Sequence, residues 1–372
     1  MINNFSKFLV LFSLFGVWSC QNKEVKQEKL SIENNYWQSN FKHQSFSKSQ
    51  KDSILNCFDK DFNGSVLVYK KGKIFKKALG YQEIQKKHKK QIDDVYQMAS
   101  VSKTVTAVAT MILHQSKQLH IDSMFSKYIN SFPYKNVSIR QLLSHRSGLP
   151  NYIYYTDSFW KNKLQLMNNK DLFDFFIKCK PKIYTAPGAS FSYNNTNYAL
   201  LPMLIESVSN KTFNQFVIDS IFKPCGMKNT FYYNCPQPEG FHSTVMTGRY
   251  EKELYEHSYY LNGILGDKSL FSSIDDMFLF YHALKTNRLI KKELLDMMHE
   301  PSYKYNVYGG SYGLGFRLKQ INNEKWVYHN GWWKGFWTFF WINIEKDTCL
   351  VVLTNNKKSS RFKLLNLLEF MD

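Results

Sequence analysis

SVSKTVTAVATMILHQSKQL, residues 100–119, starts with a serine and a lysine three positions apart and continues as an apolar run without proline or glycine. Such a run predicts a helix over 102–119 with Ser100 at its N-terminal edge. Positions i and i+3 share a helix face, so Lys103 is expected beside the Ser100 hydroxyl. An adjacent amine is one of the few groups that activate a serine hydroxyl, and the helix N-terminus favours developing negative charge. The stretch therefore indicates a nucleophilic serine.

The Ser-x-x-Lys spacing alone is weak evidence, because this lysine-rich chain repeats it at Ser45/Lys48, Ser158/Lys161, Ser220/Lys223 and Ser360/Lys363. Ser45 and Ser360 lie in polar segments without a following apolar helix, which indicates surface serines. For Ser100 itself, the alternative is a structural one, in which the serine caps the helix and the lysine extends to solvent.

Two further motifs follow along the chain. Tyr193 and Asn195 stand two residues apart just before the apolar run 198–208. His329-Asn330-Gly331 follows a short predicted strand, 325–328, and precedes a strongly aromatic one, 336–344. Tyr-x-Asn also occurs at Tyr128, Tyr232 and Tyr260, whereas His-x-Gly occurs once.

In this order the motifs resemble those of the serine beta-lactamase and penicillin-binding protein superfamily, in its class C beta-lactamase-like branch. That branch also contains D-alanyl-D-alanine peptidases and esterases. The resemblance covers about 64–355 and extends to four further segments, LLSHRSGLP at 142–150, FKPCGMKNT at 222–230, SSIDDM at 272–277 and YGLGF at 312–316.

The resemblance implies an acyl-enzyme mechanism without a cofactor or a metal. Ser100 is expected to attack an amide or ester carbonyl, with Lys103 and Tyr193 handling the proton. A tyrosine of ordinary pKa, ~10, needs a cation such as Lys103 nearby to act at neutral pH. Asn195 is expected to orient Lys103 and to bind the substrate amide.

The same resemblance assigns roles to the third motif. His329 is expected to line the opposite wall of the site. The oxyanion hole is expected to use the backbone N–H groups of Ser100 and Trp332. Gly331 is expected because a strand that closely approaches the substrate backbone has no room for a Cβ.

Departures from the family pattern bear on the substrate. His329 stands where lactamases of this branch usually carry lysine, and a neutral imidazole, with a pKa of ~6.5, supplies no permanent cation for a substrate carboxylate. This puts efficient lactam hydrolysis in doubt. Trp332 and Trp333 either narrow the cleft, form a wall for an acyl chain or pack in the sheet, whereas Trp337 and Trp341 are expected to pack.

The fold expected is α+β, an antiparallel sheet flanked by helices with a largely helical subdomain at about 123–261. A hairpin is predicted at 64–69 and 74–79, and late strands at 326–328, 336–344 and 349–354. Early and late strands are expected to pair, with the site in the crevice beside the helical part. The motifs extend from Ser100 to His329, so 52–372 is expected to form one catalytic domain.

The N-terminus predicts export. Lys7 precedes the apolar stretch 8–18, which is short for a membrane span but typical of a signal peptide at 1–19. Val17-Trp18-Ser19-Cys20 resembles a bacterial lipobox, so Cys20 is expected to carry lipid and 20–51 to form a flexible tether. Trp18 is bulkier than usual at its position, which leaves plain secretion as the alternative. We expect a membrane-anchored lipoprotein of a bacterial cell envelope, periplasmic or on the outer surface.

Charge and cysteine content add less. The formal net charge is +19, but the lysines are scattered, no nucleic-acid motif is present, and a lysine-biased surface explains the excess. Cys225 and Cys235 are spaced to close a small disulfide loop, with free buried thiols as the alternative. His145 and the remaining histidines indicate packing or surface positions, and no spacing indicates zinc.

Two functions of different class follow. The first is a serine hydrolase acting on a D-amino-acid peptide, a beta-lactam or a small ester, with a small-molecule or peptide partner derived from the cell wall. The second is a non-catalytic ligand-binding or sensing module that retains the penicillin-binding pocket.

Overall fold

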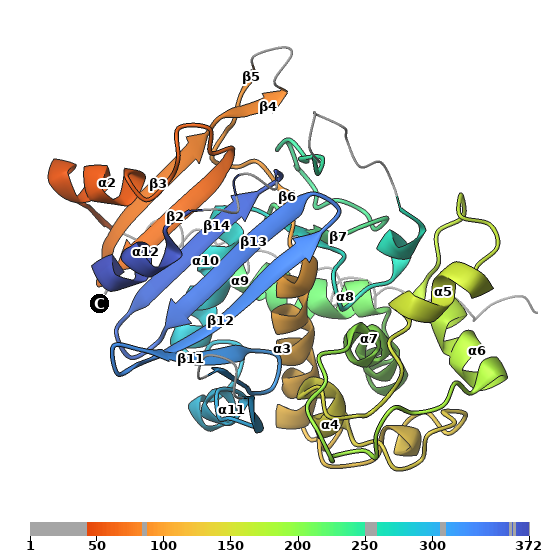
Figure 1. Cartoon of the computed structure of the whole chain (residues 1–372). Helices are drawn as coiled ribbons and strands as arrows, with labels where there is room; N and C mark the ends of the chain where they lie inside the picture. The colour runs from red at the N-terminus through yellow and green to blue at the C-terminus, as the bar shows by residue number, and fades with distance from the viewer. Residues whose placement is uncertain are drawn as a thin grey trace, which may run out of the picture. The chain divides into compact units, whose positions relative to one another are not determined.

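A nine-stranded sheet organises the structure, a computed structural model that describes residues 43–83, 88–249, 259–305, 310–356, 359 and 362–371. Its strand order is β1-β3-β2-β14-β13-β12-β11-β10-β9 (Figure 1). The strands are β1 (Gln44–Ser45), β2 (Gly64–Lys70), β3 (Lys73–Leu79), β9 (Tyr303–Tyr305), β10 (Gly310–Tyr312), β11 (Arg317–Ile321), β12 (Glu324–Trp333), β13 (Phe336–Asn343) and β14 (Thr348–Thr354).

The predicted pairing of early and late strands is confirmed. β2 lies antiparallel to β14, with Gly64 opposite Thr354 and Lys70 opposite Thr348. The hairpin β2–β3 turns through Lys71 and Gly72, both of positive φ, as a two-residue hairpin turn requires. The sheet is antiparallel except at one edge, where β1 runs parallel to β3.

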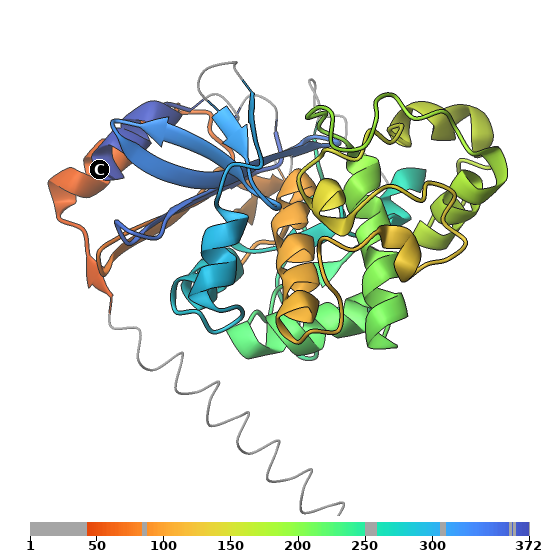
Figure 2. The same cartoon turned by 90° about the horizontal axis from the view of Figure 1, so that it is seen from below.

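Both faces of the sheet are apolar, because side chains alternate between two hydrophobic clusters. On β14, Leu350 and Val352 face one cluster, while Val351 and Leu353 face the other. The first cluster is covered by α2 (Lys48–Leu55) and α12 (Leu364–Met371), and the second by α3 (Ser102–Gln115) and α10 (Ile274–Lys285). Figure 2 shows α2 and α12 together on one side of the sheet.

The start of α2 corrects the predicted tether, which extended to 51. α2 begins at Lys48 behind a capping box in which Ser47 and Gln50 exchange hydrogen bonds. Phe46 and Ile54 are buried against the sheet, so ordered structure begins at least by Gln44. The predicted signal peptide and Cys20 lie outside the described residues.

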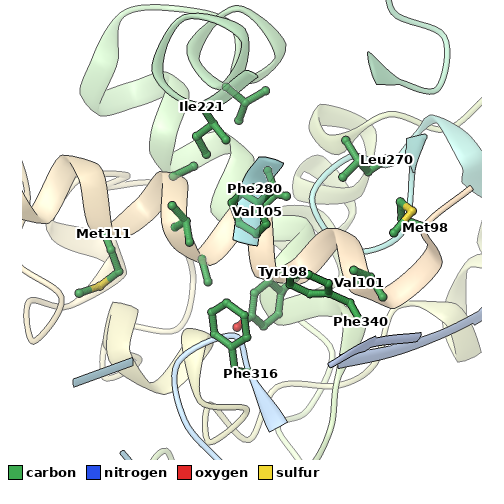
Figure 3. Close-up of a cluster of buried hydrophobic side chains, with 14 of the residues drawn as sticks. Met98, Val101, Val105, Met111, Tyr198, Ile221, Leu270, Phe280, Phe316 and Phe340 are labelled. Carbon is green, nitrogen blue, oxygen red and sulfur yellow. The ribbon is translucent and has the colours of Figure 1, made fainter. Parts of the chain in front are cut away.

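Helix α3 lies at the centre of the larger cluster. Val105 of α3 and Val101 just before the helix pack in one cluster with Tyr198, Phe316 and Phe340 (Figure 3). The helix ends at Gln115, four residues before the predicted end, because the backbone turns left-handed at Lys117, with a φ of 61°. The predicted helix is thus confirmed over most of its length.

The segment expected to be helical contains most of the remaining helices. They are α4 (Ile139–Leu143), α5 (Ile153–Phe159), α6 (Asn169–Cys179), α7 (Asn195–Ser209), α8 (Phe213–Val217) and α9 (Lys223–Cys225), with α11 (Lys292–Met298) following later in the chain. A small sheet of β6 (Tyr96–Gln97), β8 (Leu270–Ser272) and β7 (Phe231–Tyr232) was not expected. It brings the residues just before Ser100 next to a segment that follows the helical part.

The described cysteines Cys57, Cys179, Cys225, Cys235 and Cys349 are all free thiols. The disulfide between Cys225 and Cys235 is therefore not formed. No helix in the described part of the chain combines the length and the apolar character needed to cross a membrane.

Candidate active site

Ser100 lies in a tight turn, η1 (Ala99–Val101), that leads directly into α3. Ala99 has a φ of 48°, a left-handed conformation that costs a non-glycine residue on the order of 1–3 kcal/mol. Backbone bonds on both sides hold the turn, since Met98 N–H donates to Leu270 O at 2.7 Å and Val101 N–H donates to Met98 O at 3.1 Å. The strained turn projects Ser100 at the edge of the core, where its side chain is only partly buried.

Lys103 is fully buried and directed at the serine. Its Nζ lies 3.0 Å from Ser100 Oγ and 2.8 Å from the backbone oxygen of Asp267. The first distance is short enough for direct proton transfer. The neighbouring pair expected from the i and i+3 spacing is therefore present.

Tyr193 reaches the same place from the loop before α7. Lys103 Nζ lies 5.1 Å from the centre of the Tyr193 ring, and the Tyr193 hydroxyl is buried without a hydrogen-bond partner among the described residues. An unpaired buried hydroxyl costs about 1–3 kcal/mol. It is therefore an unused donor and acceptor beside the Ser100–Lys103 pair.

Asn195 does not make its expected contact with Lys103. It is the first residue of α7, half-buried, and its side chain forms no hydrogen bond to another described residue. The backbone oxygen of Asp267 orients Lys103 instead. The Asn195 amide remains available to a substrate.

The sequence predicted that His329-Asn330-Gly331 follows a short strand. In the structure the motif lies within strand β12. His329 is fully buried, and both ring nitrogens have protein partners. Nδ1 lies 2.8 Å from the Asn330 carbonyl, so it carries the proton, and Nε2 lies 3.3 Å from the Tyr312 hydroxyl. Burial, with the charges of Arg317 and Lys103, lowers the pKa of His329 well below its usual value. His329 is a neutral part of the wall with no free nitrogen for a substrate.

Gly331 is required, but for a reason other than the one expected. A Cβ at Gly331 would lie 2.2 Å from Thr338 Oγ1 and 2.4 Å from the Met98 carbonyl. The protein itself fills this space, since β12 packs directly against the turn that carries Ser100. The absence of a Cβ at Gly331 lets β12 lie close to the turn that carries Ser100. The space is not needed for an approach to the substrate.

Trp332 lies where β12 has an unpaired edge. β11 pairs with β12 only as far as Tyr328, so no described strand covers 329–333 on that side. This edge is compatible with the predicted oxyanion role of the Trp332 N–H, which stays a prediction.

The Trp332 side chain is 56% exposed beside Trp337, whereas Trp341 is buried and stacks on Tyr328 at 3.9 Å.

His145 is a site residue that the sequence analysis placed only in packing or at the surface. Its ring lies 4.3 Å from the Tyr193 ring, between centres, and its Nδ1 accepts the Asn194 N–H at 3.1 Å. The Asn197 amide nitrogen lies 3.1 Å from the same atom. Burial, with the charges of Lys103, His329 and Arg317, lowers the pKa of His145 well below its usual value. A neutral His145 thus holds the loop and the ring of Tyr193.

Arg317 is a second residue that the sequence analysis missed. It is the first residue of β11, and its guanidinium carbon lies 4.9 Å from the centre of the Tyr193 ring and 5.9 Å from that of Tyr312. The only sequence signal was its position directly after Tyr312-Gly313-Leu314-Gly315-Phe316. Arg317 supplies the permanent cation that was expected to be missing with His329.

The arrangement suits acyl transfer to a serine. Among the described residues, no group of three or more histidine, cysteine, aspartate or glutamate side chains could hold a metal ion. The hydroxyl of Ser100, the amine of Lys103, the phenol of Tyr193 and the guanidinium of Arg317 come from η1, α3, the loop before α7 and β11.

Comparisons with known proteins agree with this geometry. Residues 59–369 match the protein family described as Beta-lactamase. The chain is 31% identical to "Penicillin-binding protein 4*" of Bacillus subtilis (strain 168) over 316 residues, which cover 81% of this chain and 70% of the relative. It is 27% identical to "Protein flp" of Staphylococcus aureus (strain NCTC 8325 / PS 47), covering 78% of this chain but only 59% of the length of that relative.

Solved structures share the fold. The penicillin-binding protein from Bacillus halodurans matches with a TM-score of 0.73 at 22% identity, covering 87% of this chain and 98% of that one. The D-amino acid amidase from Ochrobactrum anthropi SV3, complexed with D-phenylalanine, matches with a TM-score of 0.71 at 19% identity, covering 87% and 99%. The predicted α+β fold class is confirmed.

The contacts of His145 give a prediction for its variants. In His145→Ala, Asn194 N–H and the Asn197 amide lose their acceptor, so we expect stability in urea unfolding to fall by about 1–3 kcal/mol. Covalent labelling by a fluorophosphonate should slow about tenfold or more, because the Tyr193 ring loses its support.

His145→Asn is the matched control. Asparagine tolerates the positive φ of 56° at this position and restores an acceptor, so stability should recover. Labelling should stay slow because the ring is still absent. A His145→Ala chain that is labelled at the wild-type rate would contradict the role given to this histidine.

Proposed function

The chain belongs to the beta-lactamase family, and on that premise we propose that it hydrolyses an amide or ester bond through an acyl-enzyme formed on Ser100. Membership of the family supports a serine hydrolase, and the activity within that class is the proposal. The observation that carries it is the distance of 3.0 Å between the buried Lys103 Nζ and Ser100 Oγ.

In the proposed acylation, Ser100 Oγ forms a bond to the substrate carbonyl carbon while its proton passes to Lys103. Tyr193 relays this proton to the leaving nitrogen or oxygen as the scissile bond breaks. Its unpaired buried hydroxyl supports that role. Water then attacks the acyl carbon, the bond between that carbon and Ser100 Oγ breaks, and a proton taken from this water restores the Ser100 hydroxyl as the acid is released.

Arg317 supports a substrate with a carboxylate close to the scissile bond. Its guanidinium lies over Tyr193, so an anionic group bound there stands beside the proton relay. Arginine binds carboxylates through two parallel hydrogen bonds and stays charged at any physiological pH. D-amino-acid peptides with a free C-terminus fit best, and penicillins carry a carboxylate too.

A simple ester is the second substrate class. The exposed Trp332 side chain, beside Trp337, offers an apolar surface for an acyl chain near the edge of β12. A non-catalytic sensing module is the rival function, since a site that acylates without deacylating would have the same residues.

Ser100→Ala tests the nucleophile. Wild-type chain should be labelled by a fluorescent penicillin or a fluorophosphonate, and the alanine variant should not be labelled, because no oxygen remains to form the acyl bond. Ser158→Ala is the control, since it removes a serine from another Ser-x-x-Lys pair. Label retained in Ser100→Ala would place the nucleophile elsewhere.

Turnover of nitrocefin or p-nitrophenyl esters by wild-type chain separates an enzyme from a sensor.

Arg317→Gln tests whether Arg317 binds the carboxylate of the substrate. With a peptide ending in D-alanyl-D-alanine, kcat/KM should fall about 10- to 100-fold, the effect of losing a charged hydrogen bond worth ~1.5–3 kcal/mol. The same peptide with its C-terminus amidated should change much less. An equal loss on both peptides would show that Arg317 supports Tyr193 and does not bind the carboxylate.

Export and lipid attachment rest on the sequence at 1–20. We expect cells that produce the chain to incorporate a palmitate analogue into it, because the lipobox cysteine is the acylated residue. Cys20→Ser should abolish that label and release the protein from membranes, while Cys179→Ser, which removes an exposed free thiol, should change neither. Label retained in Cys20→Ser would refute the anchor.

A further inference from the structure

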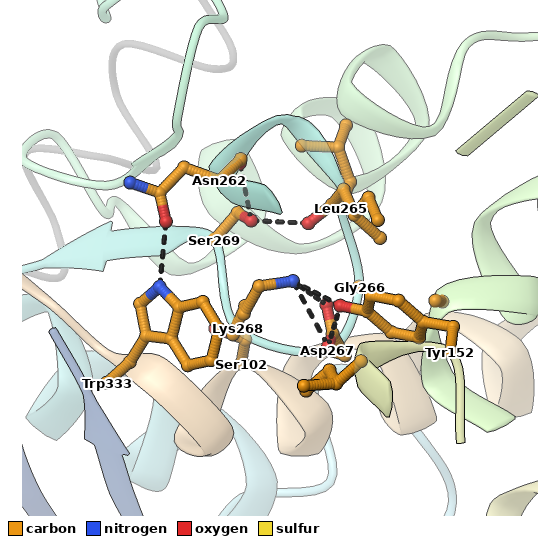
Figure 4. A network of polar contacts seen from close by, with 12 residues as sticks. Ser102, Tyr152, Asn262, Leu265, Gly266, Asp267, Lys268, Ser269 and Trp333 are labelled. Carbon is orange, nitrogen blue, oxygen red and sulfur yellow. Dashed lines mark hydrogen bonds and ion pairs between the residues drawn. The ribbon is translucent and has the colours of Figure 1, made fainter. Parts of the chain in front are cut away.

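A buried charged cluster of Asp267, Lys268 and Tyr152 lies next to Lys103, and Figure 4 shows the cluster. Asp267, Lys268 and Tyr152 have 0%, 2% and 0% exposure. Lys268 Nζ lies 3.1 Å from one Asp267 carboxylate oxygen and also contacts the Tyr152 hydroxyl. That hydroxyl donates to the other carboxylate oxygen at 2.8 Å. All three polar groups are thus satisfied by one another.

The cluster touches Lys103 through the backbone. The carbonyl oxygen of Asp267, the residue whose carboxylate binds Lys268, accepts the Lys103 Nζ at 2.8 Å. Thr106, one turn further along α3, donates to the carbonyl of Gly266 at 2.8 Å. The position of the 266–268 backbone therefore sets the direction in which the Lys103 amine points.

The cluster also connects two other walls of the site. Lys268 Nζ lies between the rings of Tyr152 and Trp333, 5.1 and 5.2 Å from their centres. Trp333 belongs to β12 and follows Trp332, and its Nε1 donates to Asn262 Oδ1 at 2.7 Å. Tyr152 N–H donates to Thr196 Oγ1 at 2.8 Å, next to Asn195 at the start of α7. The ammonium group of Lys268 thus links three parts of the site. They are strand β12, the 266–268 segment that contacts Lys103, and the start of α7 next to Tyr193.

A buried ion pair contributes little net stability, because the cost of removing two charges from water offsets their attraction. Hydrophobic residues of similar volume would fill the same space. A charged pair at the junction of three catalytic segments is better explained by the geometry that it imposes. Losing the Lys268 charge would remove the ion pair from the Asp267 carboxylate and leave it the Tyr152 hydroxyl, so the 266–268 backbone would be held less firmly.

We propose that charged Lys268 is a positioning residue, which fixes the Asp267 carbonyl on Lys103 and the end of β12 beside Ser100, and so controls the rate of acylation. The inference rests on the proposed function. It assigns to a second lysine a role in the reaction without contact with the substrate.

The ionisable groups that face Lys268 are Asp267, Tyr152 and, through its charge, Lys103. Burial lowers the pKa of Lys268 to about 8, although Asp267 opposes the shift. Burial and the Asp267 charge raise the pKa of Tyr152 well above its usual value, so Tyr152 stays protonated. Lys268 should lose its proton above about pH 8, and acylation should decline with it.

Stability should respond in the opposite direction. The unfolded chain holds the Lys268 proton up to about pH 10.5, whereas the folded chain releases it near 8. The unfolded state then binds more protons in this interval, so this group stabilises the fold as pH rises. An alkaline loss of acylation without a matching loss of stability distinguishes positioning from unfolding.

The experiment measures the second-order rate of Ser100 labelling by a fluorescent penicillin or a fluorophosphonate from about pH 6 to about pH 10, with melting temperature in parallel. Wild-type labelling should decline with a midpoint near pH 8. Lys268→Met should label about 10- to 100-fold more slowly at pH 7 and lack this alkaline decline.

Two further variants keep the result interpretable. Lys268→Arg retains the charge at all these pH values, so it should label well and move the alkaline decline beyond pH 10 even if Lys268→Met folds poorly. Lys90→Met is the matched control, since Lys90 is another buried lysine, 5% exposed, that packs on Tyr96 and Met246. It should keep the wild-type pH profile.

Two outcomes would overturn the inference. One is a Lys268→Met or Lys268→Arg chain that keeps the wild-type alkaline decline, because Lys268 then does not titrate in the reaction. The other is a wild-type chain that takes no label, which overturns the proposed function as well. A labelled wild type with an unchanged Lys268→Met profile refutes only the positioning role.

Discussion

The site depends on one constraint, that a lysine amine enclosed by protein needs oxygen partners in place of water. Lys103 has two, the hydroxyl of Ser100 from the turn just before its own helix and the carbonyl of Asp267 from a segment far along the chain. The second partner requires the 266–268 backbone to lie against the first turns of α3. Gly315 approaches the same helix closely, where a Cβ would lie 2.3 Å from the Ala107 methyl group. Close packing around the first turns of α3 thus accompanies the burial of this amine.

Local patterns predicted much of the fold and the pair Ser100–Lys103. A short apolar run followed by a Lys-Gly turn marks the β2–β3 hairpin, and a single helical turn joins the serine and the lysine. Strand β12 was predicted too short because His329, Asn330 and Gly331 interrupt its apolar pattern. The placement of Tyr193 came only from the family resemblance, since spacing alone cannot bring it to Lys103.

His145 lies within the family-like segment 142–150 and Arg317 directly follows the segment 312–316, but no local pattern assigns these two residues or Asp267 to the site. Each becomes a site residue through tertiary contacts, with the Tyr193 ring for His145 and Arg317 and with Lys103 for Asp267. Gly331 shows the converse, a residue singled out for a reason other than the one that the structure gives, because the atoms that exclude its Cβ belong to Thr338 and to the Met98 carbonyl. Sequence patterns identify site residues that lie close together along the chain. Contacts between residues that are distant in the sequence become visible only in the structure.

The pairing of β2 with β14 has a consequence for synthesis of the chain on the ribosome. β2 is made early, but its partner on one side is complete only when Thr354 has been added. Until then β2 and β3 form an isolated hairpin, which is marginally stable in water. The turn that carries Ser100 packs on β12. The strand that pairs with β12, β13, is also synthesised late. The turn that carries Ser100 can therefore reach its final packing only after β12, β13 and β14 have been synthesised.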